Sequence, residues 1–519
     1  MLRRRQPKPA DAPRAPRTTA LPMLFAALAG AVTVFAFAPF GWWPLQILAL
    51  AFLFYQVGMD TNVRRSSWLG WAFGVGAAIA GMHWLYITMN RFGNVPGPMA
   101  VAAVILLGMY MGLFGALTTG MATWLRKRWS VPVNAFLLLV LPFAWGITEW
   151  MRGWVFTGFP WVASGYAHNA SPLAGFAPVV GVYGLGVIVA LCASCVVMLT
   201  QRARWFGVGL LCTLMAAGYG LTLFAWTTPQ GQPLTVRLLQ GNVPQQQKFD
   251  PEHVMRVLQQ YRAMTMAERA DLIALPETAI TILPQYLPPD YLPSLKTFAA
   301  ESNSYLLVGL PLSDGPDLYA NSAAGFAPAG GTAYRYDKHH LVPFGEFVPP
   351  GFRWFVDMMR IPLGDMTRGA QVQGAFPVKD QLVLPNICYE DVFGEEIALQ
   401  LRSMDKPATI LLNMSNLAWF GESIAIPQHL QISQMRALET GRPMLRATNS
   451  GATVVIDGRG QVTASLPNYT QGTLAAKVQG MGGMTPFIHF GNYLLLVLAA
   501  LAFGGAWFSG RKYLKSRQK

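Results

Sequence analysis

The strongest constraint on the fold is a series of long apolar runs. A membrane-crossing helix needs about 20 consecutive apolar residues, and runs near that length follow one another through the first 226 residues and recur near the C-terminus. We expect about eight membrane helices, near residues 21–40, 42–58, 67–90, 98–125, 131–151, 172–199, 205–226 and 487–508. The chain is accordingly 53% hydrophobic and only 12% charged, with a mean hydropathy of +0.33. This composition excludes an ordinary soluble protein.

Lys and Arg are spread unevenly over the connections between these runs. Five groups share one side: the N-terminal tail, Arg64–Arg65, Arg126–Arg128, Arg202–Arg204 and the C-terminal tail. The connections on the other side hold only Arg91 and Arg152. Because basic loops stay in the cytoplasm, we expect both termini there. Pro39 follows the small-x-small sequence Ala36-Phe37-Ala38 and should discourage signal-peptide cleavage, so we also expect the first helix to be retained.

Residues 228–485 have ordinary globular composition and are expected to form a domain outside the cytoplasm. They carry 19 Lys and Arg against 22 Asp and Glu, so the net charge of +14 belongs to the rest of the chain. The basicity is therefore a topology signal, and we expect no nucleic-acid binding. The expected division is a basic tail (1–20), a seven-helix membrane domain (21–226), the outer domain (228–485), one more membrane helix (487–508) and a second basic tail (509–519).

The outer domain alternates between strand-like and helix-like patterns. Short apolar runs predict strands at 234–242, 272–278, 304–312, 382–390, 408–416, 443–451 and 452–460. Helical spacing predicts helices at 251–270, 291–301, 394–404 and 428–441. This alternation with short connections favours an α/β layered sandwich.

Cys388 is the cysteine most relevant to chemistry. The other three, Cys192, Cys195 and Cys212, lie in predicted membrane helices. With no disulfide partner in its domain, Cys388 is either a core thiol or a reactive one. It ends the apolar run LVLPNI, which places it at a rim and favours a nucleophile.

A thiol needs a base or a cation nearby to react. Glu277 and Lys338 also stand at predicted strand ends in the same domain. A carboxylate can accept the thiol proton, and an ammonium can stabilise both thiolate and oxyanion. The three residues together predict covalent catalysis through a thioester.

Other interpretations are open at this point. His339 or His340 could form a Cys–His pair with Cys388, although adjacent strand residues face opposite sides. A membrane-tethered amidase or nitrilase that releases its product to water would share the same three residues. A transporter with a sensory domain is disfavoured by the sparse intramembrane charge. The seven histidines show no ligand spacing, so no metal and no cofactor are expected.

At these residues the sequence resembles the nitrilase superfamily, and most closely its membrane branch, the apolipoprotein N-acyltransferases. The resemblance covers nearly the whole chain. It rests on the strings TEWMRGWVFTGFPW (148–161), QGNVPQQQKFDP (240–251), LPETAI (275–280), YDKHHLVPFGEFVP (336–349), NICYED (386–391), NLAWFGES (416–423) and MRALETGRPMLRATNSG (435–451). It implies an α-β-β-α sandwich beside the membrane helices.

The resemblance also implies a reaction and residue roles. Cys388 would take an acyl chain from a phospholipid, and the α-amine of a diacylglyceryl-cysteine at a lipoprotein N-terminus would receive it. Glu277 would be the general base and Lys338 the oxyanion stabiliser. Further residues would assist: Glu346 as a second acidic group, Tyr389 and Glu390 beside the nucleophile, and Trp419 and Asn321 in the pocket.

Two positions depart from the family pattern. Leu417 stands where an acidic residue is expected, and Phe249 where Trp is common. Both departures concern the substrate channel.

Two further groups are candidates for substrate contact. Residues 344–364 are rich in aromatics and Met, including Phe344, Trp354 and Phe355, and are expected to form a lipid-facing gate. Glu149 and Arg152, three residues apart near the outer end of a helix, are expected either to contact a phospholipid headgroup or to hold the outer domain. The resemblance implies a place in the bacterial inner membrane, and the distribution of Lys and Arg puts the catalytic domain in the periplasm. Nothing in the sequence demands a dimer, so we expect a monomer.

Overall fold

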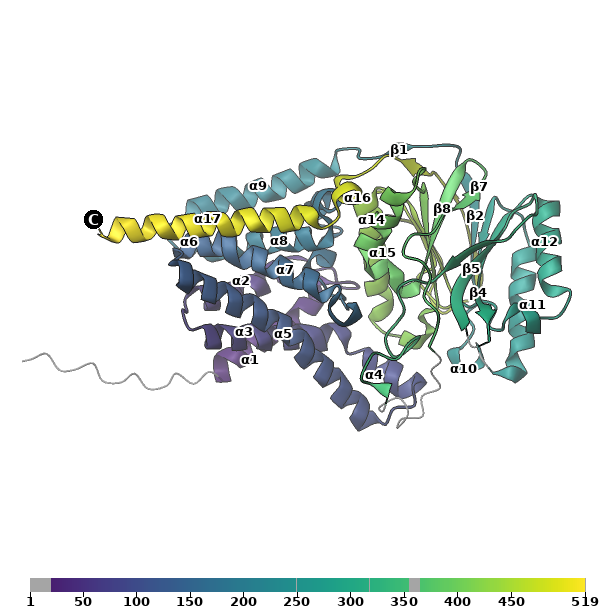
Figure 1. Cartoon of the computed structure of the whole chain (residues 1–519), viewed down its shortest axis with the longest axis horizontal. Coiled ribbons are helices and arrows are strands. Elements are labelled where there is room, and N and C mark those ends of the chain that lie inside the picture. The colour runs from purple at the N-terminus through teal and green to yellow at the C-terminus, as the bar shows by residue number, and fades with distance from the viewer. Residues whose placement is uncertain (1–19, 249, 317, 354–364, 519) are drawn as a thin grey trace, which may run out of the picture.

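The computed structural model describes residues 20–248, 250–316, 318–353 and 365–518. They form a helical bundle and an α/β domain that meet end to end (Figure 1). The bundle is built from the first part of the chain and the C-terminal helix α17 (Tyr493–Gln518). The predicted Trp354 and Phe355, most of the proposed gate and the Phe249 departure lie outside the described residues.

The bundle helices match the apolar runs. In chain order they are α1 (Ala20–Val32) with η1 (Thr33–Ala36), α2 (Pro44–Gly58), α3 (Val63–Met82), α4 (Leu85–Ile87) with η2 (Thr88–Phe92), α5 (Gly97–Trp129), α6 (Val133–Ala135) with η3 (Phe136–Val140), α7 (Leu141–Arg152), η4 (Val155–Thr157), η5 (Ser164–His168), η6 (Pro172–Phe176), α8 (Ala177–Met198) and α9 (Arg204–Thr222). Within the described part of the chain, five helical stretches are long and apolar enough to cross a membrane, or six if the pair bent by 59° around Met82–Leu85 is one span. Two shorter apolar helices, Ala20–Ala36 and Pro44–Gly58, precede them. The expected number of about eight spans stays a prediction.

Small residues let the longest helices approach closely. A Cβ on Gly70 of α3 would lie 2.2 Å from the carbonyl oxygen of Gly115 on α5. Glycines at such contacts bring helix backbones together where lipid offers no hydrophobic driving force for association. The backbones of α3 and α5 are therefore in close contact. The helix α5 reaches toward the α/β domain (Figure 1).

The α/β domain contains two mixed six-stranded sheets. The first has the order β13-β2-β3-β4-β5-β6 and the second β12-β11-β10-β9-β8-β7. The strands are β2 (Leu234–Gln240), β3 (Leu272–Ala274), β4 (Tyr305–Gly315), β5 (Leu318–Phe326), β6 (Tyr334–Asp337), β7 (Phe376–Val378), β8 (Gln381–Ile387), β9 (Ile410–Ser415), β10 (Met444–Thr448), β11 (Val454–Ile456), β12 (Val462–Ser465) and β13 (Gly472–Val478). A short pair, β1 (Thr228–Pro229) with β14 (Met481–Gly482), closes the junction with the bundle.

Helices cover both outer faces of the paired sheets. Figure 1 shows α11 (Pro251–Met266) and α12 (Tyr291–Ser302) on the face far from the bundle. On the bundle side lie α14 (Gly394–Ser403), α15 (Ala425–Thr440) and α16 (Pro486–Phe490). Side chains such as Leu272 and Leu412 fill the space between the sheets. This is the expected α-β-β-α sandwich.

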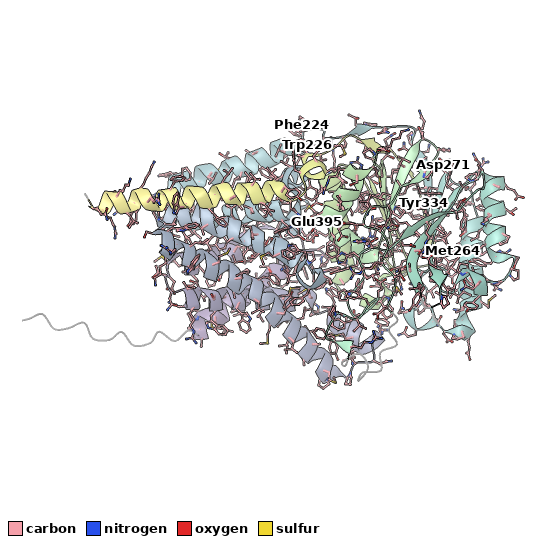
Figure 2. All side chains as sticks on the ribbon, viewed as in Figure 1. Phe224, Trp226, Met264, Asp271, Tyr334 and Glu395 are labelled. Carbon is pink, nitrogen blue, oxygen red and sulfur yellow. The ribbon has the colours of Figure 1, made fainter. Side chains whose placement is uncertain are left out.

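The bundle and the α/β domain share one apolar core. The cluster that fills the bundle continues through Ile432 and Met435 of α15 to Tyr389, Val392 and Phe393. Figure 2 places Phe224 and Trp226 at the junction, where their rings pack with centroids 4.6 Å apart. Residues 388–393 therefore lie where the two parts of the molecule meet.

Candidate active site

Three candidate residues lie at strand ends, as the sequence pattern predicted. Glu277 follows β3, Lys338 directly follows β6, and Cys388 directly follows β8. Cys388 has a φ of +51°, so the chain turns sharply from β8 into the short 3-10 helix η8 (Cys388–Val392). A positive φ costs a residue with a side chain about 1–3 kcal/mol, so surrounding contacts must hold this turn.

Lys338 is the centre of a buried charge cluster. It is only 1% exposed, and its Nζ lies 2.8 Å from Glu346 Oε1 and 3.3 Å from Glu277 Oε1. Asn321, on β5, donates from Nδ2 to the same Glu277 oxygen at 2.7 Å and to the same Glu346 oxygen at 2.9 Å. One ammonium and one amide thus hold together two carboxylates that would otherwise repel each other.

Glu277 receives two further contacts. The backbone N–H of Asn416 donates to Glu277 Oε2 at 2.9 Å, and Lys248 Nζ donates to the Glu277 carbonyl at 2.9 Å. Burial by itself would raise the pKa of Glu277, but the positive charges of Lys338 and Lys248 together with the hydrogen bonds from Asn321 and Asn416 outweigh it. The pKa of Glu277 is therefore lowered, and the group is a carboxylate at neutral pH.

The pKa of the Cys388 thiol is shifted in the opposite direction, upward. Burial raises its pKa well above the ordinary value, the negative charge of Glu277 raises it further, and Lys338 opposes both effects. The resting pair is therefore a thiol facing a carboxylate, with an ammonium that favours the thiolate. This arrangement suits a nucleophile that loses its proton only when an electrophile is in place.

Glu390 and Tyr389 hold the turn formed by Cys388–Val392, here called the nucleophile turn. Glu390 accepts the backbone N–H of Ile387 at 2.6 Å and that of His339 at 2.7 Å, which ties the end of β8 to the residue after Lys338. Burial raises the pKa of Glu390 to about 7, against the lowering effect of these donors. Tyr389 donates its hydroxyl to the carbonyl of Gly158 in the bundle at 2.8 Å.

Of the residues predicted for the pocket, Asn321 belongs to the charge cluster, whereas Trp419 contacts the bundle. Trp419, 38% exposed, accepts the Thr88 hydroxyl at its carbonyl, 3.0 Å away, and packs edge-on against Phe92 with ring centroids 6.1 Å apart. Phe344 packs edge-on against Phe352 at 5.4 Å, and both are partly exposed. The gate stays a prediction, because residues 354–364 lie outside the described part.

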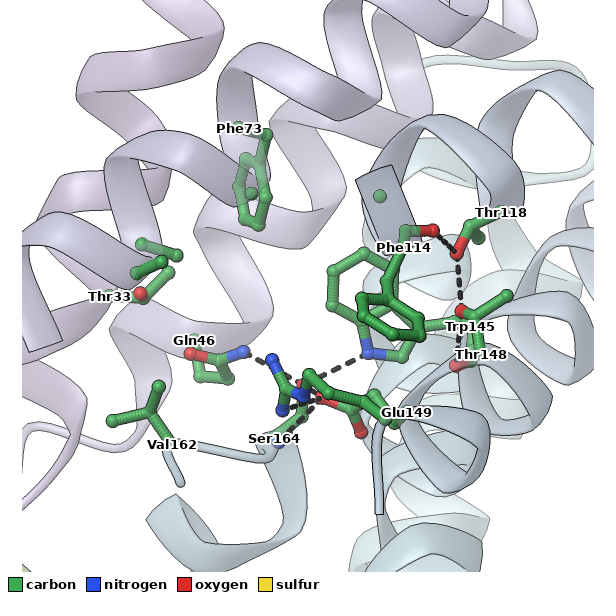
Figure 3. Close-up of a pocket in the computed structure, with 15 residues that line it drawn as sticks. Thr33, Gln46, Phe73, Phe114, Thr118, Trp145, Thr148, Glu149, Val162 and Ser164 are labelled. Carbon is green, nitrogen blue, oxygen red and sulfur yellow. Dashed lines mark hydrogen bonds and ion pairs between the residues drawn. The ribbon is translucent and has the colours of Figure 1, made fainter. Parts of the chain in front are cut away.

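Glu149 and Arg152 line a cavity of about 40 Å³ inside the bundle (Figure 3). Their charged groups are 3.8 Å apart. Glu149 Oε1 accepts both the backbone N–H and the hydroxyl of Ser164, each at 2.8 Å. All these contacts lie within the bundle, so both expected roles of Glu149 and Arg152 stay predictions.

The rival Cys–His pair receives no support from the histidine contacts. The His339 ring contacts the Gly369 carbonyl at 2.8 Å, and the His340 ring lies between Glu396 and the Thr157 carbonyl. Within the described part of the chain, no three His, Cys, Asp or Glu side chains gather as metal ligands do.

Sequence reasoning missed two residues that contact Glu277. Lys248 lies within the string 240–251 and Asn416 begins the string 416–423, so both stood in motifs already singled out. The signal that could have found Lys248 is that it is the single cation in the string 240–251. For Asn416 the contact comes from the backbone, which no side-chain pattern reveals.

Known proteins match both parts of the chain. Two family models fit, Apolipoprotein N-acyltransferase N-terminal domain over residues 29–195 and Carbon-nitrogen hydrolase over residues 235–485. The chain is 50% identical to the apolipoprotein N-acyltransferase of Ralstonia nicotianae over 487 residues, which is 92% of each chain. It is 43% identical to that of Nitrosomonas europaea, over 94% of this chain and 98% of the relative. A solved amidase from Nesterenkonia sp. matches at 18% identity with a TM-score of 0.38, over 51% of this chain and 96% of the amidase. Because the sequence identity to these relatives is high and extends through bundle and sandwich alike, the chain belongs to the apolipoprotein N-acyltransferase family.

Proposed function

We propose that this protein transfers an acyl chain from a phospholipid to the α-amine of the N-terminal diacylglyceryl-cysteine of lipoproteins, through a thioester on Cys388. The observation that carries the proposal is the set formed by buried Glu277 and Lys338 with half-buried Cys388, which directly precedes the residues that pack against the bundle. Every residue of this set comes from one chain, so a monomer suffices.

In the first half-reaction, Cys388 gives its proton to Glu277 as its sulfur attacks the ester carbonyl carbon of the phospholipid. The ammonium of Lys338 stabilises the resulting oxyanion. When the tetrahedral intermediate collapses, the C–O ester bond breaks and the proton on Glu277 passes to the departing lysophospholipid oxygen. The thioester remains, and Glu277 is again a carboxylate.

In the second half-reaction, the lipoprotein amine attacks the thioester carbonyl. Glu277 takes a proton from the attacking nitrogen and returns it to the departing sulfur. An amide forms, the C–S bond breaks, and Cys388 regains its thiol. With the attacking amine in its neutral form, each half-reaction returns its proton to the leaving group, and an amine that arrives protonated first releases one proton to solvent.

The junction with the bundle fits a lipid donor. Each methylene drawn from lipid into water costs about 0.8 kcal/mol, so a phospholipid ester must be met near the bilayer. Cys388 directly precedes Tyr389, which hydrogen-bonds to the bundle at Gly158. We infer that the bundle lies in the bacterial inner membrane with both termini in the cytoplasm and the α/β domain in the periplasm, because the basic loops lie on one side.

The experiment that tests this function follows the acyl group. Purified protein in detergent micelles is mixed with a phospholipid carrying a labelled acyl chain, and the intact mass is measured before and after a diacylated lipopeptide is added. We expect an acyl adduct on the wild type, none on Cys388→Ala, and transfer of the label to the lipopeptide amine.

The alternative, a membrane-tethered hydrolase, predicts a different fate for the label. The adduct would then decay to free fatty acid at the same rate with or without the lipopeptide. That result would contradict acyl transfer while leaving Cys388 as the nucleophile.

A further inference from the structure

The nucleophile turn is held from the membrane side by residues 153–168, which connect α7 to η6. Tyr166 donates its hydroxyl to the carbonyl of Val392 at 3.0 Å. Tyr389 donates to the Gly158 carbonyl at 2.8 Å. Both ends of the strained turn that begins at Cys388 are therefore fixed to this one segment.

A third contact reaches the middle of the turn. The Trp161 ring stacks on the His429 ring at 5.6 Å and 17°. Arg446 donates to His429 Nδ1 at 3.1 Å, which leaves His429 Nε2 to donate to Asp391 Oδ1 at 2.8 Å. Asp391 lies inside η8. A displacement of Trp161 would therefore move His429, and through the His429–Asp391 hydrogen bond it would move the nucleophile turn.

Residues 153–168 do not hold this shape by secondary structure alone. Phe156, Thr157 and Val162 all have positive φ values, of 53°, 75° and 51°. Such backbone persists only where surrounding contacts fix it. The segment therefore needs an anchor of its own.

The anchor is the carboxylate of Glu149 on α7. Its Oε1 accepts the backbone N–H and the hydroxyl of Ser164, the first residue of η5. The Ser164 hydroxyl oxygen in turn accepts from Gln46 at 3.0 Å and from Trp145 at 2.9 Å. Figure 3 shows these side chains converging beside the cavity. Glu149 is 5% exposed, so bulk solvent does not reach the contact.

We propose that Glu149 is a positioning residue for the nucleophile, acting through Ser164 and residues 153–168 on the turn that carries Cys388. The inference rests on the proposed function and adds that the bundle shapes the active site as well as anchoring it. The cavity beside Glu149, about 40 Å³, has room for a few water molecules but not for a phosphate headgroup. The polar side chains that line the cavity therefore bind one another and fix the backbone at Ser164.

The test compares Glu149→Ala with two matched variants. Only Oε1 of Glu149 accepts from Ser164, while Oε2 has no hydrogen-bond partner within the described protein. Glu149→Gln therefore keeps the acceptor and places its NH₂ where Oε2 stood. Thr148→Val removes a polar group from the same cavity and the same helix, but Thr148 contacts Thr118 and not Ser164.

The readouts are kcat and KM for thioacyl formation, and the pH profile of Cys388 alkylation by iodoacetamide followed on the Cys388 peptide. In Glu149→Ala we expect kcat to fall by about 10–100-fold, the size of effect that a displacement of about 1 Å produces, with KM for phospholipid unchanged. The relaxed turn exposes the thiol, so the alkylation profile should shift to lower pH. Glu149→Gln and Thr148→Val should resemble the wild type in both measurements.

A wild-type kcat in Glu149→Ala, or a change in KM alone, overturns the proposal. The alkylation profile needs no acyl donor, so it reports on positioning even if the wild type forms no acyl adduct and the proposed function fails. If Glu149→Ala does not fold, Tyr166→Phe removes the contact of the same segment to Val392 and should shift the profile in the same direction. An unshifted profile in folded Tyr166→Phe also overturns the proposal.

Discussion

Under the proposed function Lys338 has two roles that one pair of variants can separate: it neutralises buried carboxylates, and it stabilises developing negative charge. It is 1% exposed and pairs with Glu277 and Glu346 at 3.3 and 2.8 Å. Removing one partner of a buried ion pair costs about 3–5 kcal/mol. Lys338→Met leaves two carboxylates bridged by Asn321 without a cation, so we expect a loss of at least that size.

The loss of stability is visible as a lower midpoint of thermal unfolding. A domain of 150–250 residues shifts by about 2–4 °C per kcal/mol, so the midpoint of Lys338→Met should fall by roughly 6–20 °C. Adding Glu346→Gln removes one unpaired carboxylate and should restore about half of that difference. The single variant Glu346→Gln, which keeps the pair of Lys338 with Glu277, is the matched control.

Activity should not follow stability in this series. Loss of one oxyanion-stabilising group costs about 10²–10³ in rate, so thioacyl formation should fall by that factor in Lys338→Met and stay low in the double variant. The assays are intrinsic-fluorescence unfolding in detergent and the initial burst of acyl adduct. If the double variant recovered activity along with stability, Lys338 would be only a neutralising partner of Glu346, and the proposed catalytic role would be wrong.

Three further predictions concern neighbours of the site. A Cβ on Gly309 would lie 2.2 Å from the carbonyl oxygen of Pro276, in the loop that carries Glu277. Gly309→Ala should displace that loop and slow the acyl-adduct burst about 10-fold or more. An unchanged burst would show that the site tolerates displacement of the loop. Leu417 is fully buried in an apolar cluster, so Leu417→Asp should destabilise the protein by several kcal/mol, and an unchanged unfolding midpoint would mean that the position reaches a polar partner. Burial lowers the pKa of Lys248 to about 7, although the negative charge of Glu277, and that of Cys388 when it is a thiolate, favour the protonated form of Lys248. As pH rises through 7, this cation beside the thiol disappears, so Cys388 alkylation should climb by less than the tenfold per unit expected of a simple thiol. Lys248→Met should steepen that climb, and a profile identical to the wild type would contradict the electrostatic link.

The sequence was sufficient to predict those features that depend on local pattern. Long apolar runs dictate helices, because every backbone polar group must be satisfied within the segment when it crosses lipid. Short apolar runs that end in Glu277 and Cys388 predicted strands with reactive groups at their rims, and the structure places both residues there. Such predictions succeed because the period of the apolar pattern and the end of a run are properties of the chain itself.

Strands of atypical composition escaped the same reasoning. The strand β5 reads LYANSAAGF, whose small residues fit beneath neighbouring elements but carry little strand propensity. The strand β13, GTLAAKV, alternates too weakly to stand out. Both strands form because they pair over long stretches, β5 with β4 and β13 with β2. A strand that depends on its pairing partner cannot be recognised from its own residues alone.

The same limit applies to the site and explains why the bundle's part in it was not foreseen. Tyr166 and Val392 are 226 positions apart, and Trp161 and Gln428 are 267 apart. The contacts that shape the nucleophile turn thus join the two halves of the chain, and the apolar core runs through the same junction. Some side chains serve both purposes. Tyr166, for example, is buried in the shared apolar core and also donates to the backbone of the turn at Val392. Cys388, the proposed nucleophile, lies at positive φ, and the backbone around it is consequently supported by contacts from the bundle.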